Sequence, residues 1–325
     1  MEEIRWGIIG CGDVTEVKSG PAFSKVPNSK LIAVMRRDGA KAADYAKRHG
    51  VKKWYSHARE LINDPEVNAI YIATPPLQHE DYTIQALAAG KPVYVEKPMT
   101  LNAAAAQRMI NATEKYKGKL VVAHYRRAQP LFIKIKELLA QKIIGDIRFV
   151  QLKMLQPINP SLVAQTENNW RMNPAIAGGG LFHDLAPHQL DLMSYYFGPV
   201  KKAFGLATKQ QKNTAVDDLV TGQILFENGT IFNGTWCFSV SAQDQLDICE
   251  IYGSKGKISF PMFGHKITVS MDNDQQDYIF NALAHVQQPM IEQVVNYFLG
   301  KGLNPCSGEE ALITMKLLDE FTTRN

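Results

Sequence analysis

The chain has two regions that differ in their pattern of apolar and polar positions. Up to about residue 123, short apolar runs alternate with segments of helical length that close on a glycine. The apolar runs occupy residues 4–9, 30–35, 68–74, 92–96 and 119–125, and the helical segments occupy residues 42–50, 80–90 and 101–118. Short apolar runs that alternate with helices predict buried strands of a parallel, doubly wound sheet.

From about residue 147 the pattern changes to long runs that alternate apolar and polar residues. These runs lie at residues 147–157, 219–240, 247–260 and 266–271. The turn signals "ENGT" and "GSKGK" interrupt them and predict hairpins, so we expect a large, open, mainly antiparallel sheet. Between the two regions, "GGGLFHDLAPHQLD" indicates a glycine-rich loop that leads into a helix, and "GEEALITMKLLDEFTT" predicts a C-terminal amphipathic helix.

Composition narrows the class of protein. With 325 residues, 45% of them hydrophobic, the chain is long enough for two domains. The 36 basic and 32 acidic side chains leave a net charge of +4, which is too balanced for a nucleic-acid-binding protein. No apolar stretch is long enough for a membrane span, the N-terminus lacks the charge of a signal peptide, and the four cysteines are scattered. We therefore expect a cytoplasmic protein with no membrane or nucleic-acid partner.

A glycine turn follows the first predicted strand in "GIIGCGDVT". Gly10 permits a tight turn, and Gly12 lets the backbone approach a pyrophosphate, with Asp13 and Val14 opening the next helix. Thr15 stands where the dinucleotide-binding fingerprint has its third glycine. The turn in this strand–turn–helix context predicts a dinucleotide site, and an ordinary glycine turn is the alternative.

Two arginines, Arg36 and Arg37, follow the second predicted strand. An acid at that position would bind the ribose hydroxyls of NAD. An arginine instead can pair with a 2′-phosphate and stack on adenine. We therefore predict NADP as the preferred coenzyme, with NAD as an alternative, and expect Asp38 to cap the following helix.

Longer motifs resemble the glucose–fructose oxidoreductase / inositol dehydrogenase (Gfo/Idh/MocA) family. They are "GIIGCG", "GPAFSKVPNSKLIAV", "IYIATPPLQHEDYTIQALAAGKPVYVEKP" and "AGGGLFHDLAPHQLDLMSYYFG". The resemblance spans nearly the whole chain. It implies an α/β protein with an N-terminal Rossmann domain at residues 1–123 and a C-terminal α+β domain at 124–325. The last helix of the C-terminal domain could pack back on the N-terminal domain. It also implies an NAD(P)-dependent oxidoreductase of sugars, cyclitols and related diol or carbonyl compounds.

The same resemblance implies the site residues. For the coenzyme crevice these are Thr74, Pro75, His79, Glu96 and Lys97, and near the nicotinamide they are Trp170 and Arg171. Substrate contacts are expected from Lys97, Tyr125, Arg126, Asp184 and His188, of which Lys97, Asp184 and His188 form the catalytic set. Residue 96 also ends a predicted strand of an open parallel sheet, and ligands bind outside those carboxyl ends.

The residue types suit proton transfer coupled to hydride transfer. Histidine titrates near neutrality and can move a hydroxyl proton, while the Lys97 amine can polarise the oxygen or act as the acid. If the segment is helical, Asp184 and His188 share one face, and Pro187 suggests that the helix begins close to it. The sequence leaves open which of Lys97 and His188 donates the proton.

The same residues allow other interpretations. The cluster of two histidines and two aspartates at 183–191 matches no strong zinc spacing, so no metal is predicted, and His183 receives no role. A nucleotide-binding regulator that lost catalysis is the alternative function, and a reductase of amino-acid or biliverdin type is a weaker one. An open sheet leaves one face uncovered, so we expect a homodimer or homotetramer assembled through the C-terminal sheet.

Overall fold

The computed structural model describes residues 2–163, 170–212 and 214–323, which form two compact units. The first unit contains Met1–Gln129 and Leu283–Met315, and the second contains Pro130–Ala282 and Lys316–Asn325. The sequence placed the boundary after residue 123, whereas the units divide after Gln129. The first half of the last helix, up to Met315, is grouped with the first unit.

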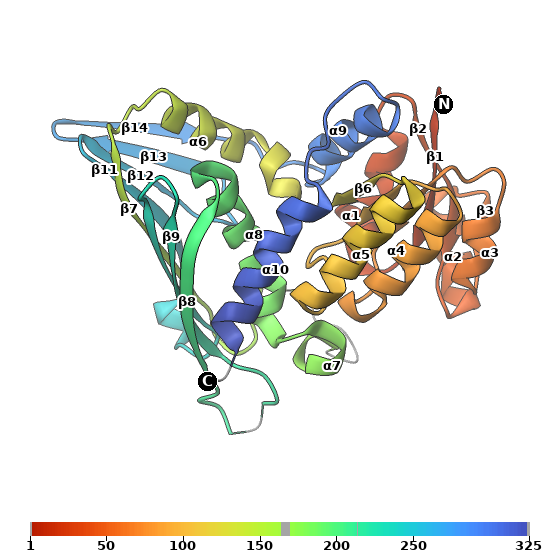
Figure 1. Ribbon diagram of the computed structural model, residues 1–325, viewed down its shortest axis with the longest axis horizontal. Coiled ribbons are helices and arrows are strands. Elements are labelled where there is room, and N and C mark those ends of the chain that lie inside the picture. Colours follow the sequence, from red (N-terminus) through yellow and green to blue (C-terminus); the bar gives the residue numbers. More distant parts are fainter. Residues whose placement is uncertain (1, 164–169, 213, 324–325) are drawn as a thin grey trace. The chain divides into compact units, whose positions relative to one another are not determined.

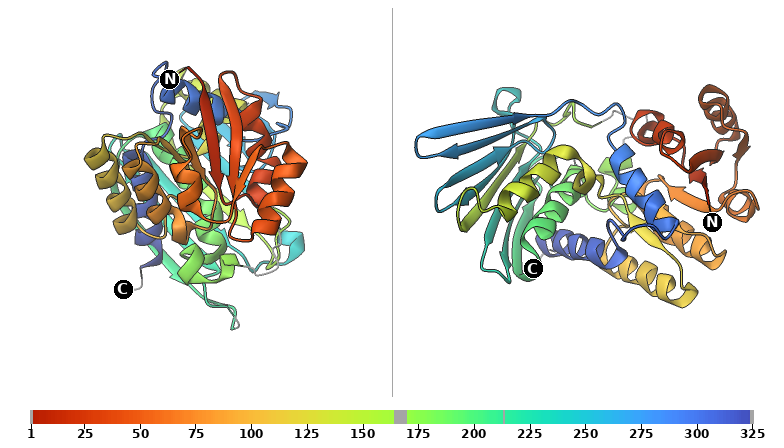
Figure 2. Two further views of the ribbon diagram at one scale, coloured as in Figure 1. Left: turned by 90° about the vertical axis from the view of Figure 1, so that its right-hand side faces the viewer. Right: turned by 90° about the horizontal axis from the view of Figure 1, so that it is seen from above.

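Six parallel strands form the sheet of the first unit, in the order β3-β2-β1-β4-β5-β6. The strands are β1 (Ile4–Ile9), β2 (Ser29–Met35), β3 (Lys53–Tyr55), β4 (Ala69–Ile72), β5 (Val93–Val95) and β6 (Leu120–Val122). The left view of Figure 2 shows the long red strands of this sheet side by side, flanked by helices. All were predicted from apolar runs except the edge strand β3, which alternates too briefly to give a pattern. This strand order reverses between β1 and β4, where open α/β sheets bind their ligands.

Helices connect these strands and cover the sheet (Figure 1). They are α1 (Asp13–Val17), α2 (Gly39–His49), α3 (Ala58–Asn63), α4 (His79–Ala88), α5 (Ala103–Tyr116) and, from the returning segment, α9 (Gln288–Phe298), with 3₁₀ turns η1 (Gly20–Ser24), η2 (Pro76–Gln78) and η3 (Tyr125–Ala128). As expected, Asp38 caps α2, because its carboxylate accepts a hydrogen bond from the Lys41 amide at 3.1 Å. Helix α2 ends at Gly50, whose φ of 65° is left-handed.

The second unit is built on an eight-stranded sheet in the order β14-β13-β12-β11-β7-β10-β9-β8. Its strands are β7 (Ile147–Leu155), β8 (Val200–Thr208), β9 (Leu219–Phe226), β10 (Ile231–Cys237), β11 (Leu246–Gly253), β12 (Gly256–Phe260), β13 (Lys266–Met271) and β14 (Asp274–Ile279). Neighbouring strands run antiparallel except β7 and β10, which are parallel. The predicted fold class is confirmed. Strands β8 and β14 had not been predicted, and the residues of β14 are polar and mostly exposed.

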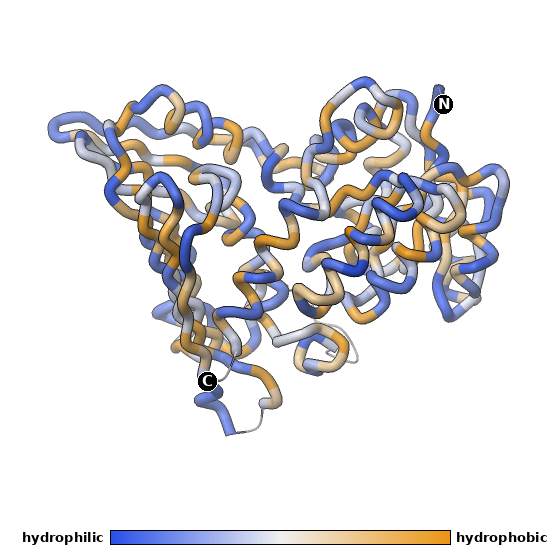
Figure 3. The backbone as a smooth tube through the Cα atoms, viewed as in Figure 1, coloured by the Kyte–Doolittle hydropathy of each residue, from blue (hydrophilic) through white to orange (hydrophobic). Residues whose placement is uncertain are grey.

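Helices cover one face of this sheet (Figure 1), namely α6 (Pro130–Ala140), α8 (Gly180–Phe197) and the second half of α10 (Gly308–Thr322). Figure 3 shows hydrophobic and hydrophilic positions alternating along the strands, as a half-covered sheet requires. Gly205 of β8 and Gly222 of β9 are register partners beneath the ring of Phe321, and a Cβ at either position would collide with that side chain. The two glycines therefore make the groove that seats α10.

Helix α8 begins earlier than the sequence suggested. It starts at Gly180, and Pro187 lies inside it, so the expectation that the helix begins near Pro187 is wrong. An internal proline gives up one backbone hydrogen bond and strains the turn before it. Burial of residues on both sides of the proline, from Leu185 to Met193, stabilises the helix in spite of that cost.

In the described part of the chain, no helix is both long and apolar enough to cross a bilayer. Nor do those residues bring three or more histidine, cysteine, aspartate or glutamate side chains together in a way that would hold a metal ion. The cytoplasmic location stays a prediction.

Candidate active site

The glycine turn after β1 occupies the carboxyl edge of the parallel sheet. Gly10 has a φ of 94°, and a Cβ there would lie 2.7 Å from the backbone nitrogen of Thr74. Both the left-handed backbone and the close approach to the β4 turn require glycine at this position. Gly12 differs, because its backbone is extended and a Cβ would meet no described atom within 4 Å. Neither strain nor internal packing therefore explains the glycine at residue 12.

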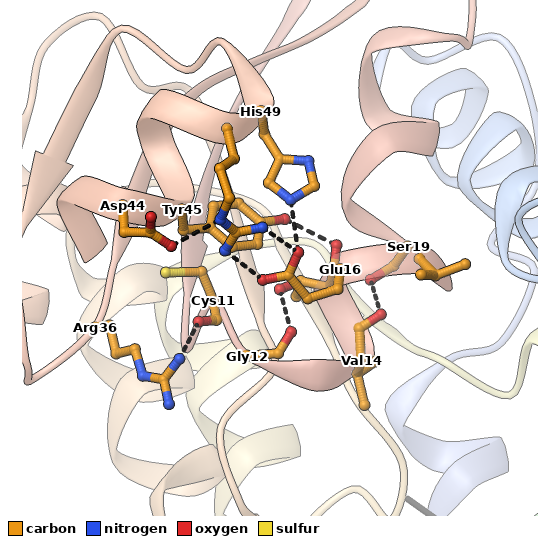
Figure 4. A network of polar contacts seen from close by, with 12 residues as sticks. Cys11, Gly12, Val14, Glu16, Ser19, Arg36, Asp44, Tyr45 and His49 are labelled. Atoms are coloured by element: carbon orange, nitrogen blue, oxygen red, sulfur yellow. Dashed lines mark hydrogen bonds and ion pairs between the residues drawn. The ribbon is translucent and has the colours of Figure 1, made fainter. Parts of the chain in front are cut away.

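Helix α1 spans only Asp13–Val17, and a network of polar contacts holds it against α2 (Figure 4). Glu16 accepts bonds from both terminal nitrogens of Arg48, each at 2.8 Å, and lies 2.8 Å from the imidazole of His49. The Arg48 hydrogen bond lowers the pKa of Glu16 to about 2. Below it, the Tyr45 hydroxyl donates to the Thr15 carbonyl at 2.8 Å. These contacts fix the start of the turn-to-helix segment.

Thr15 takes over part of what the third fingerprint glycine would do. Its hydroxyl is buried and donates to the Gly12 carbonyl at 2.7 Å, which closes the first turn of α1. The close approach falls instead to Gly20, where a Cβ would collide with the Thr15 carbonyl and the Tyr45 hydroxyl. This exchange could not be predicted from the sequence, because the compensating glycine lies outside the motif.

Arg36 and Arg37 follow β2 and have different surroundings. The Arg36 guanidinium is half-buried and donates to the Cys11 carbonyl in the glycine turn at 3.3 Å (Figure 4), whereas Arg37 is exposed. Asp38 is engaged as the cap of α2. Burial raises the pKa of the Cys11 thiol to about 11, so this thiol stays protonated at neutral pH.

His79 fixes the turn that follows β4 to the turn that follows β5. Its Nε2 lies 2.7 Å from the Thr74 carbonyl, and its Nδ1 lies 3.1 Å from the Pro98 carbonyl. Burial lowers the pKa of His79 to about 4, so the ring is neutral and carries a single N–H. Pro75 lies between these residues as the cap of η2.

Glu96 and Lys97 follow β5. The Glu96 side chain is 6% exposed and accepts hydrogen bonds from the Tyr71 hydroxyl and the Gln287 amide, each at 2.5 Å. Its second oxygen accepts from the backbone N–H of Lys97 at 3.3 Å. The Lys97 side chain is half-buried, and the peptide bond to Pro98 is cis.

The segment after β6 is more enclosed than its predicted substrate role suggests. Tyr125 and Arg126 lie in η3, are each 7% exposed, and contact one another as a cation–π pair with 5.8 Å between guanidinium and ring. Next to them, Arg127 forms an ion pair with Glu310 at 2.7 Å. The substrate role of Tyr125 and Arg126 stays a prediction.

Helix α8 of the second unit carries the other predicted catalytic residues. Asp184 and His188 lie one turn apart in it, and the His188 ring is buried and packs edge-on against Phe263 with 6.1 Å between centroids. Asp184 forms an ion pair with Arg171 at 2.9 Å. Their neighbour His183 is buried in the same helix, and burial lowers its pKa to about 4.

The "NNWRMNP" stretch is described only from Trp170 onward, because residues 168 and 169 lie outside the described residues. Trp170 and Arg171 lie in a short 3₁₀ turn, η4 (Trp170–Met172), and the Arg171 guanidinium is 4.5 Å from the Trp170 ring. From the sequence, the alternative to a role in the site was a surface arginine beside a buried tryptophan. The structure instead shows a half-buried Trp170 beside a buried arginine, since Arg171 is 8% exposed and forms an ion pair with Asp184.

The predicted residues thus fall into two groups. One group lines the carboxyl edge of the parallel sheet in the first unit and includes Gly10, Gly12, Arg36, His79 and Lys97. The other group, Arg171, Asp184 and His188, belongs to the second unit. Tyr71 and Gln287, which donate hydrogen bonds to Glu96, were not predicted from the sequence, because no sequence motif marks a buried hydrogen-bond partner.

Three kinds of comparison describe what the chain is similar to. Residues 4–124 match the profile of the Gfo/Idh/MocA "oxidoreductase family, NAD-binding Rossmann fold", and residues 132–259 match the profile of that family's C-terminal domain. The chain is 48% identical over 318 residues to oxidoreductase P35 of Formosa agariphila, which covers 98% of both chains.

A more distant relative is trans-1,2-dihydrobenzene-1,2-diol dehydrogenase of Bos taurus, 31% identical over 255 residues, which are 78% of this chain and 72% of the relative. Among solved structures, the aldose–aldose oxidoreductase of Caulobacter crescentus, crystallised with glycerol, superposes with a TM-score of 0.85 at 22% identity, covering 98% of this chain and 96% of the other. Taken with the glycine turn and the Glu-Lys-Pro segment, these matches show that the chain belongs to the Gfo/Idh/MocA family of NAD(P)-binding oxidoreductases.

Proposed function

We propose that this oxidoreductase transfers a hydride between NADP(H) and a C–OH or C=O group of a sugar-like, cyclitol or cyclic diol substrate. The observation that supports the proposal most is the carboxyl edge of the parallel sheet, where the glycine turn follows β1 and Lys97 follows β5, the strands on either side of β4. The names of the relatives add the substrate class, since a dihydrobenzene diol and an aldose both carry hydroxyl groups on adjacent carbons.

The residues present fit a dinucleotide. Gly12 leaves open space where a side chain would stand, as a backbone that approaches a pyrophosphate requires. The preference for NADP is supported by Arg36, whose guanidinium lies at the glycine turn, and by Asp38, whose carboxylate is committed to capping α2. An acid that already caps a helix is poorly placed to accept from ribose hydroxyls.

Bound NADP(H) would donate or accept the hydride, and the protein would manage the proton. In this proposal Lys97 interacts with the reacting oxygen, and His188 exchanges its proton. Asp184, held by Arg171, keeps a negative charge one helical turn from His188.

The function is tested by mixing the protein with NADPH or NADH and a panel of compounds, and following the nicotinamide absorbance. The panel would contain levoglucosan, aldoses, inositols and trans-1,2-dihydrobenzene-1,2-diol, with the corresponding carbonyl compounds for the reverse direction. We expect turnover of at least one compound, faster with the phosphorylated coenzyme. Tight binding of NADPH without turnover of any compound would contradict the proposal and favour a regulator.

The role of Arg36 is tested by its alanine variant. Arg36→Ala should weaken NADPH binding about 10- to 100-fold, because it removes a cation from the 2′-phosphate, and should change NADH binding little. Arg59→Ala, which removes an exposed arginine from α3, is the matched control. Equal losses for both coenzymes would remove the phosphate argument.

The catalytic roles are tested by Lys97→Met and His188→Asn. Each should lower kcat by about 100- to 10,000-fold and leave the dissociation constant of NADPH within a few-fold of the parent. The variant that is rescued by small amines or by imidazole identifies the proton donor. A Lys97→Met protein with nearly parental kcat would refute the role of Lys97.

We also propose self-assembly through the uncovered face of the large sheet. That face exposes Phe149, Phe204, Leu206, Ile231 and Leu246, whose exposed fractions range from 37% to 63%. A monomer rarely leaves so many large apolar side chains on one face. Light scattering should show a dimer or tetramer, and Leu206→Asp should shift it towards the monomer, whereas a monomeric parent protein would contradict the proposal.

A further inference from the structure

A buried polar cluster lies behind Lys97. The carboxylate of Glu96 is its centre. One carboxylate oxygen accepts hydrogen bonds from the Tyr71 hydroxyl and the Gln287 amide, and the other accepts one from the backbone N–H of Lys97. The Tyr71 hydroxyl has one proton, and its 2.5 Å contact with the carboxylate is shorter than the 3.1 Å contact with the Ser19 hydroxyl. Glu96 is therefore held by three donors in a region that excludes water.

The orientation of the Gln287 side chain is fixed at both ends. Its amide oxygen accepts from the Tyr94 hydroxyl at 3.0 Å, and its amide nitrogen donates to Glu96. A carboxylate accepts only from the nitrogen and a phenol donates best to the oxygen, so the amide cannot be flipped without losing both bonds. Gln287 is fully buried and caps α9.

The cluster joins segments that are distant in the sequence. Gln287 lies 191 residues after Glu96, in the stretch that returns to the first unit after the second unit is complete. Its backbone N–H donates to the Lys18 carbonyl at 3.2 Å, and Tyr71 reaches Ser19, so both contacts meet the residues directly after α1. The cluster thus connects the end of the glycine-turn helix with the segment that carries Lys97.

Stability alone is a weak reason for such a group. The surroundings are aromatic, since Tyr71 stacks on Tyr94 with 5.2 Å between ring centroids and also contacts Phe23. Burial of a carboxylate in such a place costs several kcal/mol before its hydrogen bonds are counted, and apolar residues of equal volume often stabilise a fold as well or better. The second oxygen of Glu96 instead contacts the main chain of Lys97, whose side chain we propose acts on the substrate.

We propose that Gln287 and Tyr71 are positioning residues for the reaction: they hold the Glu96 carboxylate so that it fixes the backbone of Lys97 and hence the origin of its amine. This inference rests on the proposed function of Lys97. Loss of either donor lets the carboxylate turn away from the Lys97 amide. The backbone of Lys97, and with it the position of its side-chain amine, is then less well defined. A displacement of about 1 Å at a reacting group lowers a rate by about 100-fold.

The test compares Gln287→Met and Tyr71→Phe with the control Tyr55→Phe. Methionine matches glutamine in length and lacks the amide, and phenylalanine removes a single hydroxyl. Tyr55→Phe also deletes one phenol hydroxyl of the first unit that donates to a carboxylate, but the acceptor is Asp64, which lies outside the Glu96 cluster. Tyr71→Phe also keeps the inference testable if Gln287→Met fails to fold, as judged by circular dichroism.

Two measurements are made on each variant. Without any substrate, hydrogen–deuterium exchange reports the amide of Lys97 in the peptide from Tyr94 to Met99, and it should become at least about threefold faster in Gln287→Met and Tyr71→Phe. With NADPH and the panel compound that is turned over fastest, kcat should fall about 10- to 100-fold while the NADPH dissociation constant changes by less than about threefold. Tyr55→Phe should stay near the parent in both measurements.

The outcomes separate this inference from the proposed function. Parental exchange and parental kcat in Gln287→Met and Tyr71→Phe, with Lys97→Met inactive, would overturn the inference and leave the function standing. Equal losses in Tyr55→Phe would also overturn it, because they would indicate general damage to the first unit. A fully active Lys97→Met would instead refute the function on which the inference rests.

Discussion

The two units use their sheets in opposite ways. In the first unit the strands are short, nearly all their residues are buried, and the candidate site residues stand in the turns where strands end. In the second unit the strands are long and alternate, and Asp184 and His188 project from a covering helix. Backbone groups at strand ends are therefore suited to binding a coenzyme. Side chains that project from a helix are suited to chemistry that differs between relatives.

Two glycines make the same contrast at the level of single atoms. At Gly12 of the first unit a Cβ would find open space among the described residues, whereas at Gly222 of the second unit it would collide with Phe321. The first glycine leaves room for something outside the chain, and the second leaves room for the chain itself. Substitutions at the two positions should therefore affect different properties.

The largest effect is expected for Gly12→Val. The added side chain should weaken NADPH binding by about 1000-fold, because it would stand where the backbone must approach the pyrophosphate. The thermal unfolding midpoint should stay close to that of the parent, since no described atom is displaced. Fluorescence titration measures the first quantity and calorimetry the second. Unaltered NADPH affinity would mean that the coenzyme does not approach this turn.

Acid should weaken both units through one buried histidine in each. Burial lowers the pKa of His79 and of His183 from 6.5 to about 4. The unfolded chain takes up these protons near pH 6.5 and the folded chain only near pH 4, so the stabilisation is complete above 6.5 and is lost as the pH falls towards 4. Each histidine contributes up to about 3 kcal/mol to this loss.

Urea unfolding between pH 7 and pH 4 measures that decline. Replacement of His183 by Gln should make the decline shallower for the second unit, and replacement of His79 by Gln should do so for the first. An unchanged pH dependence in either variant would show that the corresponding ring is already protonated, or accessible to water, in the folded protein.

A smaller effect is expected for Gly222→Ala. The methyl group would push Phe321 and α10 away from β9, which should cost about 2 kcal/mol of unfolding free energy without a direct effect on NADPH binding. Gly302→Ala is the control, because a Cβ there would make only ordinary contacts and the backbone is not left-handed. Equal stability of the two variants would show that the groove that seats α10 has room for an added methyl group.

Much of the fold could be predicted because its signals are local. The apolar runs of β1, β2 and β4, the glycine turn and the cap at Asp38 each depend on residues that are neighbours in sequence. Where the signal was weak or misleading, prediction failed. Strand β3 was too short to show a period, and Pro187 suggested a helix start although burial carries the helix through it.

The candidate site was predictable in part, for the same reason. Lys97 and His188 stand in motifs that resemble a known family, so their residue types were visible in the sequence. The ion pair of Arg171 with Asp184 and the hold of Gln287 on Glu96 were not, since neither pair is marked by a motif.

By itself the sequence determined which segments become strands and helices, which turn can meet a dinucleotide, and which family the chain resembles. Only the tertiary structure decided that Thr15 bonds to Gly12, that Gly20 supplies the close contact, and that Gln287 holds the acid beside Lys97. The physical reason is that hydrophobic periodicity and turn preferences act over a few residues. Hydrogen bonds between buried groups, in contrast, form only where folding removes water and brings distant segments together.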